Sequence, residues 1–321
     1  MVSMFCGIGG FEAAAAGLPV RAVWSNDTDA EACKTFRANH PRARMVEGDV
    51  RQIDTKTVPN CDLLVAGFPC QSFSQMGAKK AFDDPRGHLV FEVVRFLHDK
   101  HPKLFMLENV KNLVLHDGGR TLERVLQPMR ELGYDVDWRV LDAATHGGIP
   151  QHRERVFIVG SRARGGLKRF QWPEPVPMTP HRRLLDTRKR ADAKYHYPSA
   201  ADCTSALHRD INADVTDSAY FYLRKQELYA RRHESGGSVV RRYAIGRCPT
   251  LTAGMGKGGN NVPLVSTRWG PRKLTPRECA RLQGFPDAFE LPERDALAYA
   301  QLGNSVPVPL VARVLGALVA A

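Results

Sequence analysis

Residues 4–11 are "MFCGIGGF", a stretch that joins a short apolar run to the start of a helical pattern. Gly7, Gly9 and Gly10 would let the backbone approach a ligand closely where a strand gives way to a helix. The spacing is not the complete G-x-G-x-x-G motif of dinucleotide-binding folds. A tight strand–helix turn without a ligand explains these glycines equally well.

Outward from this stretch, β-rich runs and helical patterns alternate through about residue 160. The expected strands are Val2–Phe5, Arg21–Ser25, Asp62–Ala66, Leu104–Leu107, Tyr134–Leu141 and Val156–Gly160. The expected helices are Glu12–Ala16, Asp29–Asn39, Leu89–Lys100 and Thr121–Leu132. This order predicts an α/β fold with an open, mostly parallel sheet and helices on both faces. Ligands of such sheets bind beyond the carboxyl ends of the strands, so the loops after Phe5, Ser25, Ala66 and Leu107 are expected to carry chemistry.

The later part of the chain has a different composition. Four prolines crowd residues 173–180, which indicates a linker. Residues 161–270 hold 20 Lys and Arg against 9 Asp and Glu, which accounts for +11 of the net charge of +12. A basic excess confined to one region favours a polyanion-binding module over a plain solvated surface. Helical spacing resumes after Thr275, which forms a capping-box pattern with Glu278.

Bulk properties limit the class of protein. The 321 residues suggest about two domains of ~150 residues each. No run reaches the ~18 apolar residues of a membrane span, and no secretory signal is visible; the apolar C-terminal stretch, broken by Pro307, Pro309 and Arg313, predicts an amphipathic helix. The 7 cysteines form no Cys-x-x-Cys pair, which argues against a zinc site and a disulfide framework. A soluble cytoplasmic protein without a metal is expected.

Two acidic residues strengthen the ligand interpretation of the glycine stretch. Asp27 follows the second strand at the distance expected for a carboxylate that binds ribose hydroxyls. Asp49 follows a third strand and could accept a hydrogen bond from an adenine amino group. The chain has no Gly-Lys-Ser/Thr phosphate loop, so a nucleoside cofactor is favoured over a nucleoside triphosphate.

Three further loops carry reactive groups. Cys70 follows a central strand in "GFPCQSFSQM", residues 67–76; taken alone, it is best explained as an inert buried thiol. Glu108 in "LFMLENVKNL" is either a capping or ion-paired group, or an acid whose pKa is raised in a partly dry site. Arg153 and Arg155 in "PQHRERVFIVG" alternate at strand period, which indicates side chains on one side that form a salt bridge or recognise an anionic or carbonyl-bearing group.

Six motifs in order, "FCGIGGF", "GFPCQSFS", "ENV", "QHRERVFIVG", "RKLTPRECARLQGFPD" and "QLGNSVPVPL", make the chain resemble the DNA cytosine-5 methyltransferases. The compact bacterial modification enzymes are the best match. The resemblance spans the chain except for residues 165–245. The chain departs from the pattern at Thr28, where many members have an aromatic residue, and in having only Met1–Met4 before the first motif.

The resemblance implies a Rossmann-like S-adenosylmethionine-dependent methyltransferase domain with a mostly parallel sheet, plus a smaller irregular target-recognition domain. Residues 1–172 and 290–321 would form the first, and residues 173–289 the second. The implied reaction moves a methyl group from S-adenosyl-L-methionine to C5 of a flipped-out cytosine in a specific sequence of double-stranded DNA. S-adenosyl-L-homocysteine is the product, and no metal takes part.

The resemblance also implies functions for individual residues. Cys70 adds as a thiolate to C6 of the cytosine, Glu108 binds N3 and the exocyclic amine, Arg155 holds O2, and Arg153 positions the base and favours the thiolate. The implied cofactor-binding residues are Phe5, Gly7, Gly9, Gly10, Asp27, Asp49, Val50, Pro69 and Asn304. The implied DNA-binding residues are Gln71, Ser74, Lys79, Lys80, Arg86 and Thr250.

Residues 71–87 would form a lid over the flipped base, and residues 173–289 would grip phosphates and read base edges in the major groove. The expected partner is double-stranded DNA, bound by a monomer at the nucleoid, with a companion restriction endonuclease in the same system but no complex with it. Three alternatives stay open: an RNA (tRNA) cytosine-5 methyltransferase with the same chemistry, a catalytically silent DNA-binding relative, and a dinucleotide-dependent oxidoreductase.

Overall fold

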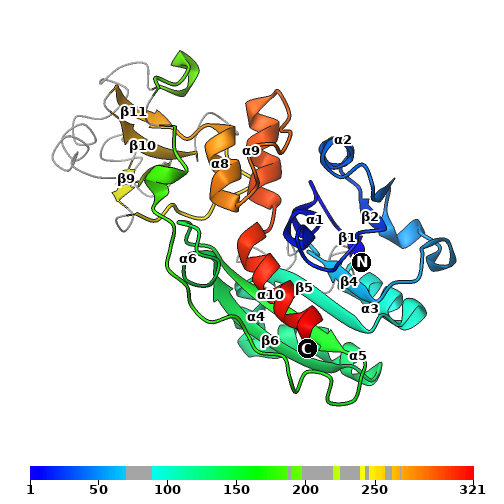
Figure 1. Ribbon diagram of the computed structural model, residues 1–321. Helices are drawn as coiled ribbons and strands as arrows, with labels where there is room; N and C mark the ends of the chain where they lie inside the picture. The colour runs from blue at the N-terminus through cyan, green and yellow to red at the C-terminus, as the bar shows by residue number, and fades with distance from the viewer. Residues whose placement is uncertain are drawn as a thin grey trace. The chain divides into compact units, whose positions relative to one another are not determined.

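Residues 2–161 contain a seven-stranded sheet (Figure 1). Its strands are β1 (Val2–Met4), β2 (Trp24–Asp27), β3 (Arg44–Glu47), β4 (Leu63–Ala66), β5 (Leu104–Val110), β6 (Asp135–Asp142) and β7 (Glu154–Ser161). The strand order is β3-β2-β1-β4-β5-β7-β6, and β7 is antiparallel to both of its neighbours. The pairs among β1 to β5 are parallel. The predicted Rossmann-like, mostly parallel sheet is confirmed, and its strand order reverses between β1 and β4, where such folds bind ligands.

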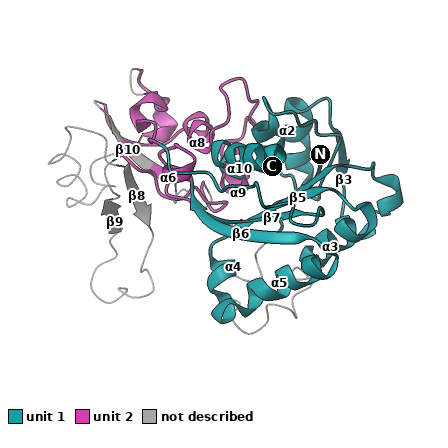
Figure 2. Ribbon diagram, turned by 60° about the horizontal axis from the view of Figure 1, so that its bottom comes forward, with its two compact units in different colours: residues 1–142, 154–176, 306–321 teal, residues 143–153, 177–305 magenta. Residues whose placement is uncertain are grey.

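The structure is a computed structural model that describes residues 1–69, 89–186, 189–196, 220–224, 239–242, 246–256, 262–267 and 269–321. These divide into two compact units, shown in teal and magenta in Figure 2. Unit 1 comprises residues 1–142, 154–176 and 306–321, and unit 2 comprises residues 143–153 and 177–305. The assignment of residues 1–172 and 290–321 to catalysis and of residues 173–289 to target recognition stays a prediction.

Helices cover both faces of the sheet in unit 1 (Figure 2). One face carries α3 (Leu89–Lys100), α4 (Asn112–Leu115) and α5 (Arg120–Glu131), and the other carries α1 (Gly10–Ala15), α2 (Ala30–Asn39) and α10 (Val308–Ala320). α2 begins where the Asp29 side chain accepts hydrogen bonds from the N–H groups of Glu31 and Ala32. All four residues of β4 are buried, as expected of a central strand covered on both faces.

Unit 2 contains a second sheet that the sequence patterns do not predict. Four strands, β8 (Tyr220–Arg224), β9 (Val239–Arg242), β10 (Pro263–Thr267) and β11 (Gly270–Lys273), pair antiparallel in the order β11-β10-β8-β9. The described helices of unit 2 are α6 (Ala143–His146), α8 (Pro276–Gln283) and α9 (Asp295–Asn304). The predicted capping box at the start of α8 is confirmed, because Thr275 and Glu278 each accept a hydrogen bond from the other's backbone N–H.

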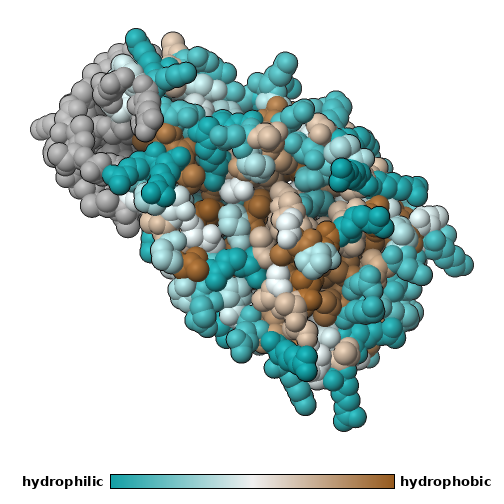
Figure 3. Space-filling view, in the orientation of Figure 1, coloured by the Kyte–Doolittle hydropathy of each residue, from teal (hydrophilic) through white to brown (hydrophobic). Residues whose placement is uncertain are grey.

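The apolar C-terminal stretch 295–320 is long and hydrophobic enough to cross a membrane by length and composition alone. The chain breaks it into α9 and α10 at Ser305–Pro307, and 61% of its most apolar window is buried inside the protein. α10 buries six apolar side chains, and Gly316 lies against Leu18. The stretch therefore has the burial of core helices. Hydrophilic residues make up much of the face in Figure 3, and Phe91 and Leu115 are the large apolar residues with high exposure among those described.

Candidate active site

The loop after β1 has an unusual backbone. Phe5, Gly7 and Gly9 have φ angles of 53°, 54° and 90°, in the left-handed region. Phe5 pays a steric cost there, since residues with a Cβ seldom adopt this conformation. A Cβ at Gly9 would lie 2.3 Å from the His40 ring, so this position requires glycine for space as well as for backbone angle.

Asp27 ends β2 beside this loop and holds it in place. Its two carboxylate oxygens accept hydrogen bonds from the backbone N–H of Gly7 at 2.8 Å and of Asp29 at 2.9 Å. Burial raises the pKa of the Asp27 carboxyl, although these hydrogen bonds act in the opposite direction. Each carboxylate oxygen has a second lone pair, so the group can also accept from the hydroxyls of a ligand.

Asp49 and Val50 follow β3. Asp49 caps a short 3-10 turn by accepting from the Arg51 N–H at 3.0 Å, and its carboxylate also pairs with the Arg51 guanidinium. This hydrogen bonding by Arg51 holds the pKa of Asp49 below its usual value. Val50 is 1% exposed and packs in the core, so any contact of Val50 with a ligand must come from its backbone.

The loop after β4 is fixed by the end of β5. The Asn109 side-chain amide donates to the carbonyl oxygen of Phe68 at 3.0 Å, and both residues are buried. A Cβ placed on Gly67 would lie 3.5 Å from Phe11 and 3.7 Å from Oε2 of Glu108. Asn109 therefore fixes Phe68, directly before Pro69, and Glu108 lies beside Gly67. Asn109 was not predicted as a site residue, although its place next to Glu108 in "ENV" is the signal that could have found it.

Glu108 forms an ion pair with Arg155 of the neighbouring strand β7. Nε of Arg155 lies 3.0 Å from Oε1 of Glu108, and the two side chains are 13% and 10% exposed. The antiparallel register places Arg155 opposite Val110, two residues beyond Glu108. The structure thus brings together the predicted acid, the predicted O2-binding arginine and the start of the Cys70 loop.

Arg153 has different partners. It lies directly before β7, which begins at Glu154. Arg153 is 2% exposed and donates to the carbonyl oxygens of Leu251 at 2.7 Å, Gly303 at 3.1 Å and Ser305 at 2.6 Å, all in unit 2.

Two other predicted site residues also lie in unit 2. The Thr250 hydroxyl donates to the His152 carbonyl oxygen at 2.6 Å. Asn304 is the last residue of α9 and is exposed. The remaining predicted residues lie outside the described part of the chain: Cys70, Gln71, Ser74, Lys79, Lys80 and Arg86.

The described cysteines are unsuited to nucleophilic chemistry. Burial raises the pKa of each of these thiols, to about 12 for Cys33, and a nucleophile needs a thiolate. The other four are Cys6, Cys61, Cys248 and Cys279. Within the described residues, no group of three His, Cys, Asp or Glu could hold a metal ion.

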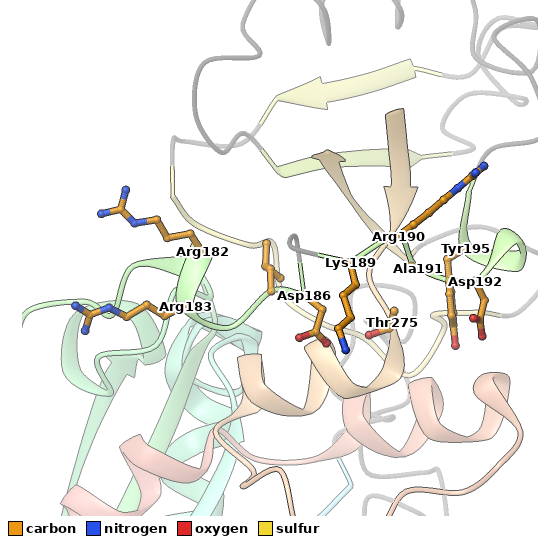
Figure 4. A pocket seen from close by; sticks show the side chains of 10 residues that line it. Arg182, Arg183, Asp186, Lys189, Arg190, Ala191, Asp192, Tyr195 and Thr275 are labelled. Carbon is orange, nitrogen blue, oxygen red and sulfur yellow. The ribbon is translucent and has the colours of Figure 1, made fainter. Parts of the chain in front are cut away.

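Unit 2 also contains a basic pocket, shown in Figure 4. Its cavity has a volume of about 1020 Å³ and is lined by four cations, two carboxylates, Leu185, Ala191, Tyr195 and Thr275. The cations are Arg182, Arg183, Lys189 and Arg190, and the carboxylates are Asp186 and Asp192. Arg281 pairs with Asp186 at 3.0 Å, so part of the negative charge at the pocket is already neutralised.

Comparison with known proteins decides the family. The model of the C-5 cytosine-specific DNA methylase family matches residues 1–320. The chain belongs to this family. It is 39% identical over 320 residues to the type II methyltransferase M.Bsp6I of Bacillus sp. (strain RFL6), covering 98% of this chain and 96% of that protein. It is 31% identical to the type II methyltransferase M.HhaI of Haemophilus parahaemolyticus, covering 96% and 90%.

Solved structures support the same fold. The Dnmt2 methyltransferase of S. pombe superposes with a TM-score of 0.73 at 19% identity, covering 99% of this chain and 98% of that one. A putative DNA modification methyltransferase of an E. coli prophage gives 0.68 at 21% identity, covering 99% and 97%. Such identities establish fold alone. The family model and the type II relatives make this chain a DNA (cytosine-5)-methyltransferase of the restriction–modification type.

Proposed function

We propose that the chain transfers a methyl group from S-adenosyl-L-methionine to C5 of a flipped-out cytosine within a specific sequence of double-stranded DNA, through a covalent bond between Cys70 and C6. The observation that carries the proposal is the end of β5. There Asn109 fixes the loop that leads to Cys70, and Glu108 beside it is paired with Arg155.

The residues at the carboxyl ends of β1, β2 and β3 fit this cofactor. Asp27 and Asp49 offer carboxylate acceptors for the ribose hydroxyls and the adenine amine, and the ring of Phe5 offers an apolar surface for the adenine. Gly7 leaves open space, since a Cβ there would meet no atom within 4 Å. Gly9, Gly10, Val50, Pro69 and Asn304 complete the proposed cofactor set. The bound cofactor supplies an electrophilic methyl group.

The chemistry follows from the side chains. The Cys70 thiolate adds to C6, which breaks the aromaticity of the ring and makes C5 nucleophilic. Glu108 hydrogen-bonds N3 and the exocyclic amine, and Arg155 holds O2, so both offset charge that develops as the sulfur adds. After methylation the C5 proton leaves and Cys70 is eliminated, which restores the ring and the free thiol. Sulfur suits both steps because it is a good nucleophile and a good leaving group.

DNA binding is proposed to use the basic excess of residues 161–270. Arg182, Arg183, Lys189 and Arg190 at the pocket of unit 2 supply phosphate contacts, together with Thr250 and the predicted lid residues Gln71, Ser74, Lys79, Lys80 and Arg86. We expect a cytoplasmic monomer that acts on the nucleoid beside a companion restriction endonuclease. The 31–39% identity to type II methyltransferases favours DNA over the RNA alternative.

The test is methylation of plasmid DNA by the purified protein, followed by bisulfite sequencing, with tRNA assayed in parallel. A duplex that carries 5-fluorocytosine at the target should form a stable covalent complex with the wild-type protein, because the fluorine prevents the elimination step. Cys70→Ala should abolish this complex, whereas Cys61→Ala, at a partly exposed cysteine that no proposed contact uses, should retain it. Methylation of tRNA with none of DNA, or trapping by Cys70→Ala, would contradict the proposal.

A further inference from the structure

Three buried polar side chains meet in unit 2 and form what we call the polar hub: Gln151, Arg153 and Gln283. They are 0%, 2% and 0% exposed. Buried polar groups of this size destabilise a fold unless their hydrogen bonds are made. The hydrogen-bond partners of these three side chains therefore show which segments the hub connects.

Arg153 connects two segments that are distant in sequence. One end of its guanidinium donates to the Leu251 carbonyl, and the other donates to the carbonyls of Gly303 and Ser305. Gly303 lies in the last turn of α9, where carbonyls lack intrahelical donors and a cation is favourable. The planar, forked guanidinium can serve both segments at once, which a lysine ammonium cannot.

The two glutamines extend the same connection. Gln151 donates to the Leu282 carbonyl at 2.8 Å and accepts from the Leu251 N–H at 3.2 Å. Gln283 donates to the carbonyl of Leu302 at 2.7 Å, one residue before Gly303. The hub thus ties the segment around Leu251 to the ends of α8 and α9.

The segments also pack directly on each other. A Cβ on Gly303 would lie 2.1 Å from the carbonyl carbon of Thr252, a backbone atom that cannot rotate away. On the other side of Leu251, the Thr250 hydroxyl is bonded to the His152 carbonyl oxygen. Leu251 and Gly303 thus belong to one fixed backbone arrangement. Thr250 directly precedes Leu251 in the sequence, and Asn304 directly follows Gly303.

We propose that Arg153 is a positioning residue, which sets Thr250 for DNA and Asn304 for the cofactor through the polar hub and does not touch the target cytosine. This inference rests on the proposed function, which supplies the contacts of Thr250 and Asn304. It replaces the sequence-based assignment of Arg153 to the base and the thiolate.

Arg153→Lys tests the proposal, since it keeps the charge and loses the fork. Affinity for S-adenosyl-L-homocysteine is measured by calorimetry, and affinity for the target duplex by fluorescence anisotropy. Both should weaken by about tenfold, because several hydrogen bonds of one charged group are lost together. The midpoint of the trapping rate against pH, measured with a saturating 5-fluorocytosine duplex, should stay at the wild-type value. Unchanged affinities with a midpoint shifted to higher pH would overturn the proposal and place Arg153 beside the thiolate.

Gln283→Met provides a second test that removes no charge. It should weaken binding of S-adenosyl-L-homocysteine without shifting the pH profile, and it decides the matter if Arg153→Lys does not fold. Arg42→Lys is the matched control, at an exposed arginine of unit 1 outside residues 161–270, and should bind both ligands as the wild type does. Wild-type protein that neither methylates nor traps DNA would refute the proposed function. An active wild type whose Arg153→Lys and Gln283→Met variants bind both ligands normally would refute this inference alone.

Discussion

The molecule contains two Arg–Glu pairs that differ in geometry and access. In unit 2, the Arg272 guanidinium meets Glu278 with two hydrogen bonds of 2.7 Å, and the side chains are 1% and 0% exposed. The N–H groups of Thr275 and Asp186 also donate to the Glu278 carboxylate. In unit 1, Arg155 meets Glu108 through Nε at 3.0 Å, and the side chains are 13% and 10% exposed.

The difference agrees with the proposal that Glu108 and Arg155 act in catalysis, whereas Arg272 and Glu278 hold the fold together. Burial acts to raise the pKa of Glu278, but the hydrogen bonds and charge of Arg272 outweigh it and the pKa is lowered. Four donors surround that carboxylate, so Glu278 joins β11, α8 and the segment at Asp186 and has no place for a ligand. Glu108 lies near the end of β5 beside Gly67, and its side chain is 10% exposed. We therefore expect the same residue types to serve different purposes in the two pairs.

The largest expected effect separates the two pairs by activity. Glu108→Gln should lower kcat for DNA methylation by roughly 10²–10⁴-fold, because an amide cannot share a proton with N3 of the cytosine. The melting temperature should fall much less than in Glu278→Gln, whose carboxylate is fully enclosed. Initial rates at saturating DNA and cofactor, together with thermal melts of both variants, measure the contrast. A Glu108→Gln enzyme with wild-type kcat would show that Glu108 has no part in the chemistry.

The next effect separates the pairs by stability. Arg272→Met should lower the free energy of unfolding by about 3–5 kcal/mol, since it leaves Glu278 charged and buried without its partner. Arg272→Met combined with Glu278→Leu should cost less than the sum of the two single changes. The corresponding cycle of Arg155→Met and Glu108→Leu should show a smaller coupling energy, because those side chains are more exposed than those of Arg272 and Glu278. Urea denaturation of the six variants tests this order, and equal coupling in the two cycles would contradict it.

The sequence predicts those parts of the fold whose signals are local. Helix α3 has the predicted bounds, Leu89–Lys100, because its apolar positions recur at helical spacing between charged ends. The capping box of α8 is likewise written in four adjacent residues. Strand β2 ends two residues later than predicted, since its polar residues Asn26 and Asp27 pair with neighbouring strands instead of ending the strand. The four-stranded sheet of unit 2 shows no period in sequence.

The candidate site likewise has residues that the sequence predicts and contacts that it does not. Glu108 and Arg155 follow from strand ends and from family motifs, and the structure brings them together as an ion pair. The partners of Arg153 could not be predicted, because they lie 98, 150 and 152 residues away and are backbone carbonyls, which any residue provides. The sequence therefore indicates which side chains are reactive, but it does not indicate which backbone carbonyls a buried side chain will contact.

A third buried glutamate sharpens the comparison through pH. Glu12 is 6% exposed and accepts a hydrogen bond from the Ser25 hydroxyl at 2.8 Å. Burial raises the pKa of Glu12, and hydrogen bonding, that of Ser25 foremost, does not offset this effect. Because the folded pKa is raised, the stabilising contribution of Glu12 is present below the unfolded pKa of about 4.3 and is lost as the pH rises through the folded value. The lowered pKa of Glu278 gives the opposite sign: its contribution is present above the unfolded value and is lost as the pH falls through the folded value.

Glu12→Gln and Glu278→Gln should therefore change the pH dependence of stability in opposite directions. The stability of Glu12→Gln relative to the wild type should rise as the pH rises above about 4.3, by about 1.4 kcal/mol for each unit by which the pKa of Glu12 is raised. Glu278→Gln should be destabilised throughout this range, and its deficit should shrink only below about pH 4. Urea denaturation at a series of pH values measures both curves. A stability difference for Glu12→Gln that stays constant with pH would mean that the Ser25 hydrogen bond fully compensates the burial of this carboxylate.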